Sequence, residues 1–518
     1  MSRFNSRSSG VSKTLNHEGA VAYTLQPDME LYSMVATASL QKKFYESDDE
    51  FIDRLREVMK KVEPSLVARL AVYAREKMYL RSIPIVLLIE LNKLLASQNI
   101  NRAIISKLAV RTIQRADEIT ETLSYYQLAN SDNAFEKDGK KKKLCKLSKQ
   151  LQKGVAEAFH KFDEYQFAKY NRKAEVTLKD ALFLCHPKPE GKEEEKLFKA
   201  IADDTLKVPY TWETQLSELG QQKFETEEAK AEAFKAKWEE LIDSGKVGYM
   251  ALLRNLRNIL NANVSAKHIK AVAKVLSDKE QVKKSKQLPF RFLSAYRELE
   301  ENESPDVRTI LDALEKAVLT SAENIKGYDE KTTVCIACDV SGSMEHNINP
   351  RSKVMYYDIG LMLGMLLQNR CKKAITGIFG DIWKVKNLPK DSILRNTMDL
   401  HRIEGEVGYS TNGYKVLEYL ISKKLKVDKI MMFTDCQMWD SDGYYSRSGM
   451  IENWNEYKKI NPNAKLYLFD MTGYGNTPLN VNEKDVFLIA GWSDKIFDVF
   501  EALENGEKAL DEIRKLTL

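Results

Sequence analysis

The stretch TTVCIACDVSGSM, residues 332–344, decides the fold of the second part of the chain. It opens as a short apolar run that ends on Asp339, a pattern typical of a buried strand. Further apolar runs at 375–380, 429–435, 465–470 and 486–491 alternate with helical patterns at 354–368, 414–423 and 494–504. Strands that alternate with helices predict a parallel, doubly wound sheet. Such sheets place their sites at the carboxyl ends of the strands.

Two of these strand ends carry an aspartate. Asp339 begins the pattern D-x-S-x-S with Ser341 and Ser343, and Asp435 ends the run KIMMFTD. A carboxylate and two hydroxyls that alternate along one tight loop can face a single point, and Gly342 gives the loop room to turn. Hard oxygen donors of this kind suit Mg²⁺, with waters completing an octahedron. The alternative is an ordinary Ser/Gly-rich turn, but the position after a buried strand favours a metal site.

Other kinds of site have less support. Cys335 and Cys338 have the spacing of zinc ligands, but the sequence has no second cysteine pair or histidine pair that would supply the other two ligands. No nucleophile–base pair accompanies the Asp339 loop, so we do not expect an enzyme. Scattered cysteines and the lack of an apolar N-terminal segment predict reduced thiols and a cytoplasmic location. No apolar run approaches the roughly 18 residues of a membrane helix, so we expect no membrane partner.

Residues from about 29 to 325 have the pattern of successive helices. Apolar residues recur three and four apart, for example over 250–260 and 310–318, and prolines stand where helices would begin, at Pro84, Pro209, Pro289 and Pro305. A solenoid of HEAT type is the architecture that this pattern favours. We therefore expect a multidomain chain: an all-α solenoid over 1–328, partly irregular over 1–28, followed by a doubly wound α/β domain over 329–518.

Charge points to local patches. The net charge is +5, and the excess lies entirely in residues 1–330. Because the excess is small, a polyanion site must come from a local patch. The candidate basic residues are the run 140–143, Lys146, Lys149, Lys153, Lys161 and Lys169, with a second patch at Lys283, Lys284, Lys286 and Arg291.

Aromatic residues follow the first of these patches closely: Phe162, Tyr165, Phe167 and Tyr170. Basic residues interleaved with aromatics suit single-stranded RNA, where bases stack and phosphates meet cations. The alternative is a solvated helix face with the aromatics in the core.

The D-x-S-x-S pattern resembles the metal-ion-dependent adhesion site of von Willebrand A domains. In that family a threonine from a second loop joins the site, and the matching stretch is GYSTNGYKVLEYL (408–420), where Thr411 aligns and Ser410 is the alternative. The resemblance implies a site for Mg²⁺, or another divalent cation, with an open position for a carboxylate of a protein ligand. Its ligands would be Asp339, Ser341, Ser343, Thr411 and Asp435.

The helical part resembles the TROVE domain of the Ro autoantigen family. The matching segments are YMALLRNLRNIL (249–260), VKKSKQLPFRFLSAYREL (282–299), LRSIPIVLLIEL (80–91) and LKDALFLCHPKP (178–189). With the A-type domain after them, the resemblance covers essentially the whole chain and identifies a bacterial or phage Ro-like protein. It implies a ring of HEAT-like helices with a basic central hole, closed by the A-type domain.

The same resemblance implies partners. The RNA partners are Y-like RNA, bound on the outer surface, and the 3′ single-stranded ends of misfolded small RNAs, bound in the hole. The implied process is RNA quality control, and an exoribonuclease is a further implied partner. A lysine, an arginine four residues on and a histidine contact RNA in the family, and Lys169, Lys173 and His186 match them. Lys173 lacks the planar fork of arginine, and Arg172 beside it can compensate.

These arguments give a non-catalytic RNA-binding protein of the Ro type as the leading interpretation. A metal-dependent protein-interaction scaffold is the alternative. The RNA-binding residues that we expect are Lys149, Lys153, Lys169, Arg172, Lys173, His186 and Lys284.

Overall fold

The computed structural model describes residues 12–38, 43, 45–130, 136–137, 140–141, 146–171, 174–323, 332–348, 352–439, 449–481, 483, 485–492, 495–504 and 510–518. The chain divides into two compact units. The first contains Met1–Leu55 and Trp238–Asp511, and the second contains Arg56–Lys237 and Glu512–Leu518. Among the described helices, none combines the length and the apolar character that a membrane span requires.

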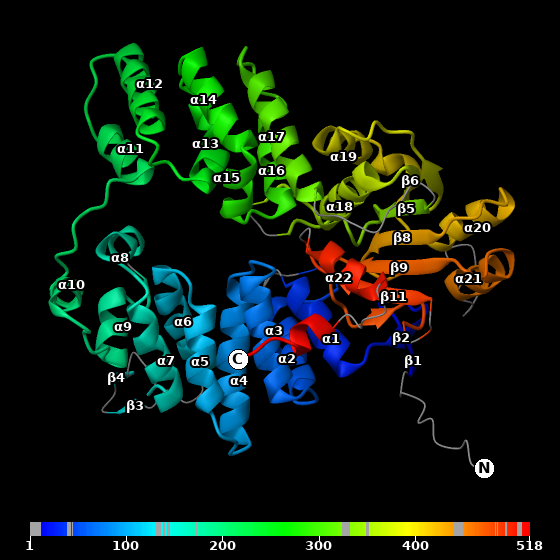
Figure 1. Cartoon of the computed structure of the whole chain (residues 1–518), viewed down its shortest axis with the longest axis horizontal. Helices are drawn as coiled ribbons and strands as arrows, with labels where there is room; N and C mark the ends of the chain where they lie inside the picture. Colours follow the sequence, from blue (N-terminus) through cyan, green and yellow to red (C-terminus); the bar gives the residue numbers. More distant parts are fainter. Residues whose placement is uncertain are drawn as a thin grey trace. The chain divides into compact units, whose positions relative to one another are not determined.

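The second unit consists of helices packed side by side (Figure 1). Contacts join α3 to α4 and α5, α4 to α6, α5 to α7, and α7 to α9, which is the packing of a helical repeat array. The elements are α2 (Asp48–Met59, shared with the first unit), α3 (Pro64–Glu76), α4 (Ser82–Ser97), α5 (Ala103–Thr112), α6 (Ala116–Ala129), β3 (Glu136–Lys137), β4 (Lys140–Lys141), α7 (Lys149–Phe159), α8 (Glu164–Tyr170), α9 (Leu178–Cys185), α10 (Lys192–Ala202), α11 (Trp212–Gly220) and α12 (Glu227–Asp243, also shared).

The contact between α5 and α7 depends on Gly154. A Cβ atom at this position would lie 2.5 Å from the carbonyl oxygen of Ser106 and 2.7 Å from Cβ of Ala109. The two helices therefore approach each other backbone to backbone at this point, which only a glycine permits.

The first unit adds further helices to the predicted array. They are α1 (Pro27–Ala36), α13 (Tyr249–Asn261), α14 (Ala266–Ser277), α15 (Lys279–Ser285), α16 (Pro289–Leu299) and α17 (Val307–Ala322). The prolines lie at or near helix starts: Pro289 opens α16, Pro84 lies in the first turn of α4, and Pro209 and Pro305 lie three and two residues before the first residues of α11 and α17. The helical array is therefore confirmed, while its closure into a ring stays a prediction.

The first unit also contains a six-stranded sheet with the order β11-β9-β8-β5-β6-β7, parallel except for the edge strand β7. This confirms the doubly wound α/β fold. The strands are β5 (Thr333–Asp339), β6 (Lys373–Phe379), β7 (Trp383–Val385), β8 (Lys429–Thr434), β9 (Lys465–Asp470) and β11 (Val486–Ala490). The helices are α18 (Tyr356–Arg370), α19 (Ile393–His401), a 3₁₀ turn (Glu404–Val407), α20 (Tyr414–Ser422), α21 (Gly449–Ile460) and α22 (Ile496–Glu504). Helix α23 (Asp511–Arg514) starts at the last residue of this unit and otherwise belongs to the second.

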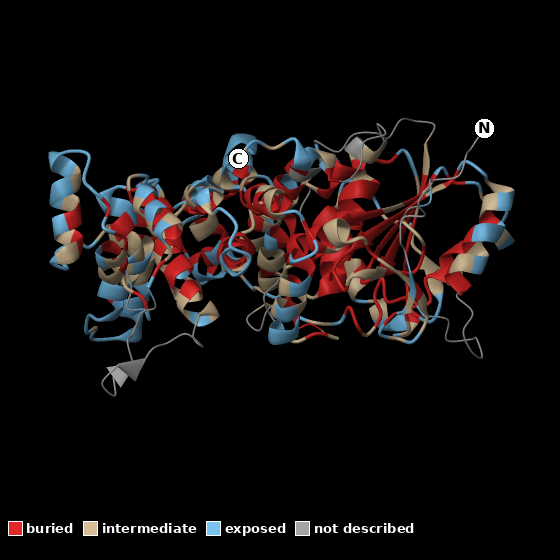
Figure 2. Ribbon diagram, turned by 90° about the horizontal axis from the view of Figure 1, so that it is seen from below, coloured by how far each residue is buried: buried red, intermediate tan, exposed pale blue. Residues whose placement is uncertain are grey.

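Helices cover both faces of this sheet, and its central strands are buried (Figure 2). Helix α18 packs on β5 and β8, where the Cys338 thiol faces the carbonyl oxygen of Gly360 at 3.8 Å. Cys335 lies in the core cluster that α20 and α21 form on the opposite face. The two cysteines therefore point away from each other, which excludes them as a zinc-binding pair.

The N-terminal segment differs from the expected irregular start of the helical part. Strands β1 (Lys13–Leu15) and β2 (Val21–Thr24) form an antiparallel hairpin, and β2 also pairs with β10 (Asn476–Thr477) beside the large sheet. A strand whose partner lies more than 400 residues away leaves no local pattern, so the sequence did not indicate it. Helices α13–α17 share the first compact unit with the sheet, and the domain boundary at 328–329 stays a prediction.

Gly154→Ala should destabilise the helical array by about 1–3 kcal/mol, because overpacking against the α5 backbone outweighs the helix propensity that alanine adds. Urea denaturation of the full chain, followed by far-ultraviolet circular dichroism, measures the change. The matched control is Gly220→Ala, a helical position where the nearest heavy atom is 4.0 Å from the added Cβ. The control should be neutral or slightly stabilising, and equal effects of the two substitutions would contradict the close approach of α5 and α7.

Candidate metal centre and nucleic-acid interface

The sheet brings two aspartates to one edge. Strands β5 and β8 are parallel neighbours with Cys338 opposite Phe433, so Asp339 and Asp435 leave the sheet at the same end. Each carboxylate is only 1% exposed. The two aspartates therefore lie at the same edge of the sheet, in a buried environment.

The D-x-S-x-S loop folds around its own aspartate. Asp339 accepts a hydrogen bond from the Ser341 N–H at 3.0 Å and one from the Thr434 hydroxyl at 2.6 Å. The hydroxyl oxygens of Ser341 and Ser343 lie 3.3 Å apart, and both residues are buried. Two hydroxyls and one carboxylate thus lie together, as the spacing predicts.

Asp435 is the less satisfied of the two carboxylates. Its Oδ1 accepts a hydrogen bond from the Gln437 N–H at 2.8 Å, but its buried Oδ2 accepts none from the described part of the chain. Burial raises the pKa of Asp435 to about 8, and the negative charge of Asp339 adds to the shift. Burial also raises the pKa of Asp339 to about 6. A buried carboxylate without a compensating charge is unfavourable, so the site suits a cation.

Thr411 belongs to a loop that touches both metal loops. The Gly342 N–H donates to the carbonyl of Tyr409 at 2.9 Å, and the Trp439 N–H donates to the carbonyl of Thr411 at 3.1 Å. Thr411 is buried, whereas Ser410 is half-buried and its N–H donates to the Asp381 carboxylate. This placement favours Thr411 over Ser410 as the third hydroxyl, and the choice stays a prediction.

The donor set fits Mg²⁺, which prefers oxygen ligands and retains several waters. Within the described ranges, no group of three or more His, Cys, Asp or Glu side chains is placed to hold a metal ion. A cation at this site would therefore depend on the hydroxyls of Ser341, Ser343 and Thr411 as well as on the carboxylates of Asp339 and Asp435. When bound, Mg²⁺ would neutralise the carboxylate pair and attract an anionic ligand.

Sequence reasoning missed the groups that come to this site from the N-terminal segment. The Asn16 amide donates to the carbonyl of Met438 at 2.8 Å, and the His17 N–H donates to the Gln437 side chain at 3.0 Å. The Tyr45 phenol also lies near this site, because the negative charge of Asp435 contributes to raising its pKa. No local sequence signal predicts these contacts, because each joins residues about 300 or more positions apart.

A second candidate site lies in the helical array, where α8 packs on α6. The Lys169 ammonium lies 5.9 Å from the ring centre of Tyr165 and 5.7 Å from that of Tyr170. The Arg115 guanidinium lies 4.6 Å from the Tyr170 ring centre. Tyr165 is 46% exposed, so this cluster offers an accessible aromatic face beside the Lys169 ammonium and the Arg115 guanidinium, which Asp117 also binds at 3.0 Å. The predicted Lys169 thus gains Arg115 as a partner that the sequence did not indicate.

The neighbouring helices carry three more of the predicted residues. Lys149 and Lys153 are exposed on α7, and Gln152 between them donates to the carbonyl of Leu184 near the end of α9 at 2.9 Å. His186 follows α9, exposed, in the left-handed conformation with φ 50°. Lys149, Lys153 and His186 therefore belong to one pair of packed helices.

The remaining predicted RNA-binding residues stand apart. Lys284 is exposed on α15 in the first unit, whereas the others belong to the second. Arg172 and Lys173 lie outside the described residues.

The two interpretations of the aromatic stretch each hold for part of it. Phe162 and Phe167 are buried and pack on each other with ring centres 5.8 Å apart, so they belong to the core. Lys161 donates to the carbonyl oxygens of Val110 and Ile113, at the end of α5. Of the four aromatic residues, Tyr165 and Tyr170 remain as candidates for stacking on bases.

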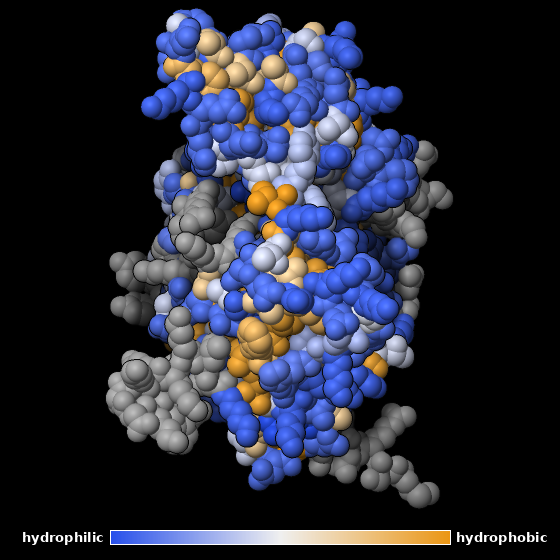
Figure 3. All heavy atoms as spheres, turned by 90° about the vertical axis from the view of Figure 1, so that its left-hand side faces the viewer, coloured by the Kyte–Doolittle hydropathy of each residue, from blue (hydrophilic) through white to orange (hydrophobic). Residues whose placement is uncertain are grey.

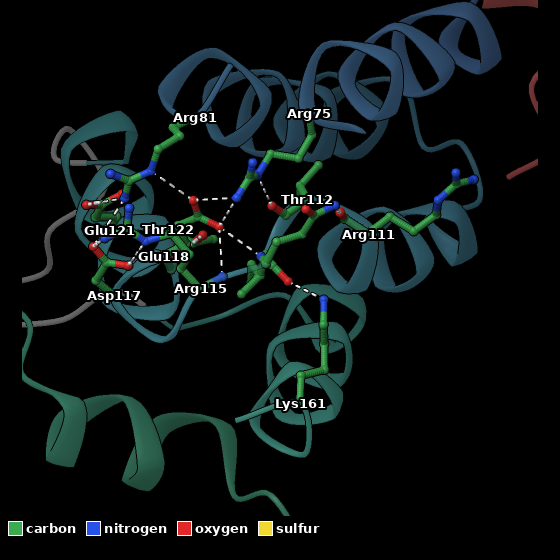
Figure 4. A network of polar contacts seen from close by, with 12 residues as sticks. Arg75, Arg81, Arg111, Thr112, Arg115, Asp117, Glu118, Glu121, Thr122 and Lys161 are labelled. Atoms are coloured by element: carbon green, nitrogen blue, oxygen red, sulfur yellow. Dashed lines mark hydrogen bonds and ion pairs between the residues drawn. The ribbon is translucent and has the colours of Figure 1, made fainter. Parts of the chain in front are cut away.

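A buried ion network holds this region together (Figure 4). Glu118 is fully buried and accepts hydrogen bonds from Arg75 at 2.8 and 3.0 Å and from Arg81 at 3.1 Å. It also accepts the N–H of Arg115 at 3.1 Å, which fixes the backbone that presents the Arg115 side chain to Tyr170.

On the face of the molecule shown in Figure 3, hydrophilic residues predominate and apolar residues form smaller groups between them.

Comparison with known proteins places both sites in a family context. Residues 29–237 and 205–334 match the family model of the TROVE domain, and together they cover more than half of the chain. Residues 333–503 match the family model of the Ro60 vWA domain. The crystal structure of the RO (RSR) protein of Deinococcus radiodurans has a similar fold, with a TM-score of 0.57 and 17% identity over 93% of this chain and 100% of that chain.

A segment of 99 residues, 19% of this chain, is 41% identical to telomerase protein component 1 of Mus musculus. The same component of Rattus norvegicus is 40% identical over 99 residues. The chain spans 3% of the length of these curated relatives, so the likeness concerns one segment of them.

At pH 7, Asp435→Asn should raise the stability of the metal-free protein, on the order of 1 kcal/mol, because it removes a carboxyl that is ionised in the unfolded chain but whose pKa is raised by burial in the folded protein. The same variant should gain no stability from Mg²⁺, whereas the wild type should gain about 2.7 kcal/mol at 100 times its dissociation constant. Thermal unfolding with and without Mg²⁺ measures both effects. Asp391→Asn removes an exposed carboxylate and should behave like the wild type. Equal stabilisation of Asp435→Asn and wild type by Mg²⁺ would count against the site.

Proposed function

Because the chain belongs to the Ro family of RNA-binding proteins, in which a TROVE domain precedes a Ro60 vWA domain, we propose that it serves in RNA quality control. In this proposal it binds a Y-like RNA and the 3′ single-stranded ends of misfolded small RNAs. The observation that carries the proposal is the cluster of Lys169, Tyr165, Tyr170 and Arg115 on packed helices α6 and α8. It combines cations for phosphates with an exposed ring for a base.

The cluster suits a single strand better than a duplex. Sequence-specific contacts to RNA mostly involve unpaired bases, which can stack on aromatic side chains, whereas A-form helices are recognised by shape and backbone. The exposed Lys149, Lys153 and His186 on the α7–α9 pair add positive charge and hydrogen-bonding capacity for the RNA backbone. The implied ring, with a hole that admits one strand and excludes a duplex, belongs to the same proposal.

The second part of the proposal concerns the metal centre. Mg²⁺ would be held by Asp339, Ser341, Ser343, Thr411 and Asp435, and a protein ligand would dock there through a carboxylate. An exoribonuclease is the partner that fits RNA quality control, and the cytoplasm is the proposed location. The support for this part is the buried carboxylate pair with its unpartnered Asp435 oxygen in the described residues. The protein would act by binding, with the chemistry left to the partner.

RNA with a single-stranded 3′ tail should bind more tightly than the matching blunt duplex. Lys169→Ala should lower the slope of log K against log salt by roughly 0.7 for each phosphate that the variant no longer neutralises. Tyr165→Ala should cost about 1–3 kcal/mol of binding to tailed RNA, because a base can no longer stack on the ring, with little change of slope. Fluorescence anisotropy over a salt series measures both quantities.

The matched control for these variants is Lys196→Ala. It removes an exposed lysine of α10 that forms an ion pair with Glu193 of the same helix. It should leave affinity and slope unchanged. Equal affinity for tailed and blunt RNA, with no decrease in Lys169→Ala or Tyr165→Ala, would exclude this RNA site and favour the metal-dependent scaffold.

Bound RNA should remain intact when the protein alone is incubated with it in Mg²⁺. The reason is that the proposed sites contain hydroxyls, carboxylates and cations without a nucleophile and base arranged for phosphodiester cleavage. Denaturing gel electrophoresis of end-labelled RNA over several hours checks this. Cleavage that depends on Asp339 or Asp435 would show that the metal centre is catalytic.

A further inference from the structure

The exposed apolar side chains of the first unit lie on the segments that surround the candidate metal centre. In the described part of this unit, four large apolar residues are exposed, each between 41% and 64%: Leu15, Ile382, Tyr409 and Trp439. Single exposed apolar residues are ordinary on a protein, whereas several that share one surface indicate a site of protein contact. The hydrogen bonds around these four residues show that they share one.

Two of the four residues flank Thr411, the predicted third hydroxyl of the metal centre. The Trp439 N–H donates to the carbonyl of Thr411 at 3.1 Å, and the Tyr409 carbonyl accepts the Gly342 N–H at 2.9 Å. The Tyr409 side chain also starts beside this loop, because a Cβ atom at Gly342 would lie 3.8 Å from the Cβ of Tyr409. Gly342 stands between the two serines of the D-x-S-x-S loop, so Tyr409 and Trp439 border the predicted ligands.

Leu15 reaches the same surface through the N-terminal hairpin. Asn16, which follows Leu15, donates its side-chain amide to the carbonyl of Met438 at 2.8 Å. Asn16 is buried, so water has little access to this hydrogen bond. Trp439 follows Met438 in the chain. The exposed Leu15 is therefore attached beside the loop that carries Trp439.

Ile382 is attached to the loop of Tyr409 in a similar way. It occupies the turn between β6 and β7, and its N–H donates to the carbonyl of Val407 at 3.1 Å. The neighbouring Asp381 carboxylate accepts the Ser410 N–H at 2.8 Å. Two hydrogen bonds, one on each side of Tyr409 in the sequence, thus hold Ile382 beside this loop.

The metal ligands themselves offer a partner very little surface. The five predicted ligands are each at most 5% exposed: Asp339, Ser341, Ser343, Thr411 and Asp435. A carboxylate that reached the cation would bury little area by itself, whereas stable protein interfaces bury roughly 800 Å² on each partner. The loops around the centre must therefore supply the area of contact, and their large exposed side chains are the apolar ones described above.

We propose that the four exposed apolar residues form an apolar rim around the metal centre, and that this rim binds a protein segment with apolar side chains on both sides of an acidic one. The inference rests on the proposed metal site, because the acidic side chain would complete the coordination of the cation. Both parts of the segment find a complementary surface, the carboxylate at the cation and its apolar neighbours at the rim. Tyr409 and Trp439 suit this role, since aromatic side chains bury a large area at a low entropic cost.

The test uses the full chain, Mn²⁺ as the probe metal and three tripeptides with blocked ends: Leu-Asp-Leu, Ser-Asp-Ser and Leu-Asn-Leu. Electron paramagnetic resonance first establishes that Mn²⁺ binds, and paramagnetic broadening of the peptide proton signals then measures the affinity of each peptide. Leu-Asp-Leu should bind the Mn²⁺-loaded protein at least roughly tenfold more tightly than Ser-Asp-Ser, because half-burying two leucine side chains contributes about that factor. Leu-Asn-Leu, which has no carboxylate, should bind more weakly than Leu-Asp-Leu.

Tyr409→Ser and Trp439→Ser should each reduce the preference for Leu-Asp-Leu over Ser-Asp-Ser severalfold. Both substitutions remove exposed side chains and leave the backbone hydrogen bonds in place, so Mn²⁺ binding and the affinity for Ser-Asp-Ser should stay unchanged. The matched control is Leu128→Ser, which removes an apolar side chain that is exposed in the second unit. This control should behave like wild type.

Three results would contradict the apolar rim while leaving the metal site intact. They are Mn²⁺ binding with equal affinity for Leu-Asp-Leu and Ser-Asp-Ser, equal affinity for Leu-Asp-Leu and Leu-Asn-Leu, or an undiminished preference in both serine variants. Failure of wild type to bind Mn²⁺ is distinguishable from all three, because it would overturn the metal site itself and the inference with it.

Discussion

Two buried carboxylates at the ends of adjacent parallel strands are the constraint on which the arrangement of the first unit depends. Because β5 and β8 are parallel neighbours, Asp339 and Asp435 leave the sheet at the same end. Burying like charges costs several kcal/mol unless they are compensated. Asp339 is compensated by the Ser341 N–H and the Thr434 hydroxyl, whereas Asp435 keeps an unpartnered oxygen among the described residues. The loops that carry Ser341, Ser343 and Thr411 lie at the same end of the sheet as this unpartnered oxygen.

The helical array buries a carboxylate in a different way, and the contrast explains which site is built for a ligand. Glu118 is as buried as Asp435, but Arg75 and Arg81 neutralise it and backbone N–H groups fill its remaining acceptor positions. A carboxylate satisfied by its own protein has no position left for a cation, so it serves to hold helices together. A carboxylate left incomplete in the interior indicates a missing positive charge.

The sequence predicted what depends on local pattern. Apolar alternation located the strands and helices of the sheet domain, and D-x-S-x-S at a strand end located the carboxylate and hydroxyls that the structure brings together. It could not predict contacts between distant segments, such as Asn16 with Met438 or Arg115 with Tyr170, because no spacing encodes them. For the same reason a basic–aromatic stretch could not show that Phe167 is core and Tyr165 is exposed.

The last helices of the TROVE region, α13–α17, share one compact unit with the sheet domain. Arg297 of α16 forms two hydrogen bonds with the buried Asp358, at 2.8 and 2.7 Å, and Asp358 also caps the start of α18. The loop that bears Ser341 and Ser343 returns to the same helix start, where the Tyr357 N–H donates to the carbonyl of Met344 at 3.2 Å. One buried carboxylate therefore holds the last helices of the TROVE region against the base of the metal loop. Helix α16 and the metal loop are therefore both held to the first turn of α18, one through the Asp358 side chain and the other through the Tyr357 N–H.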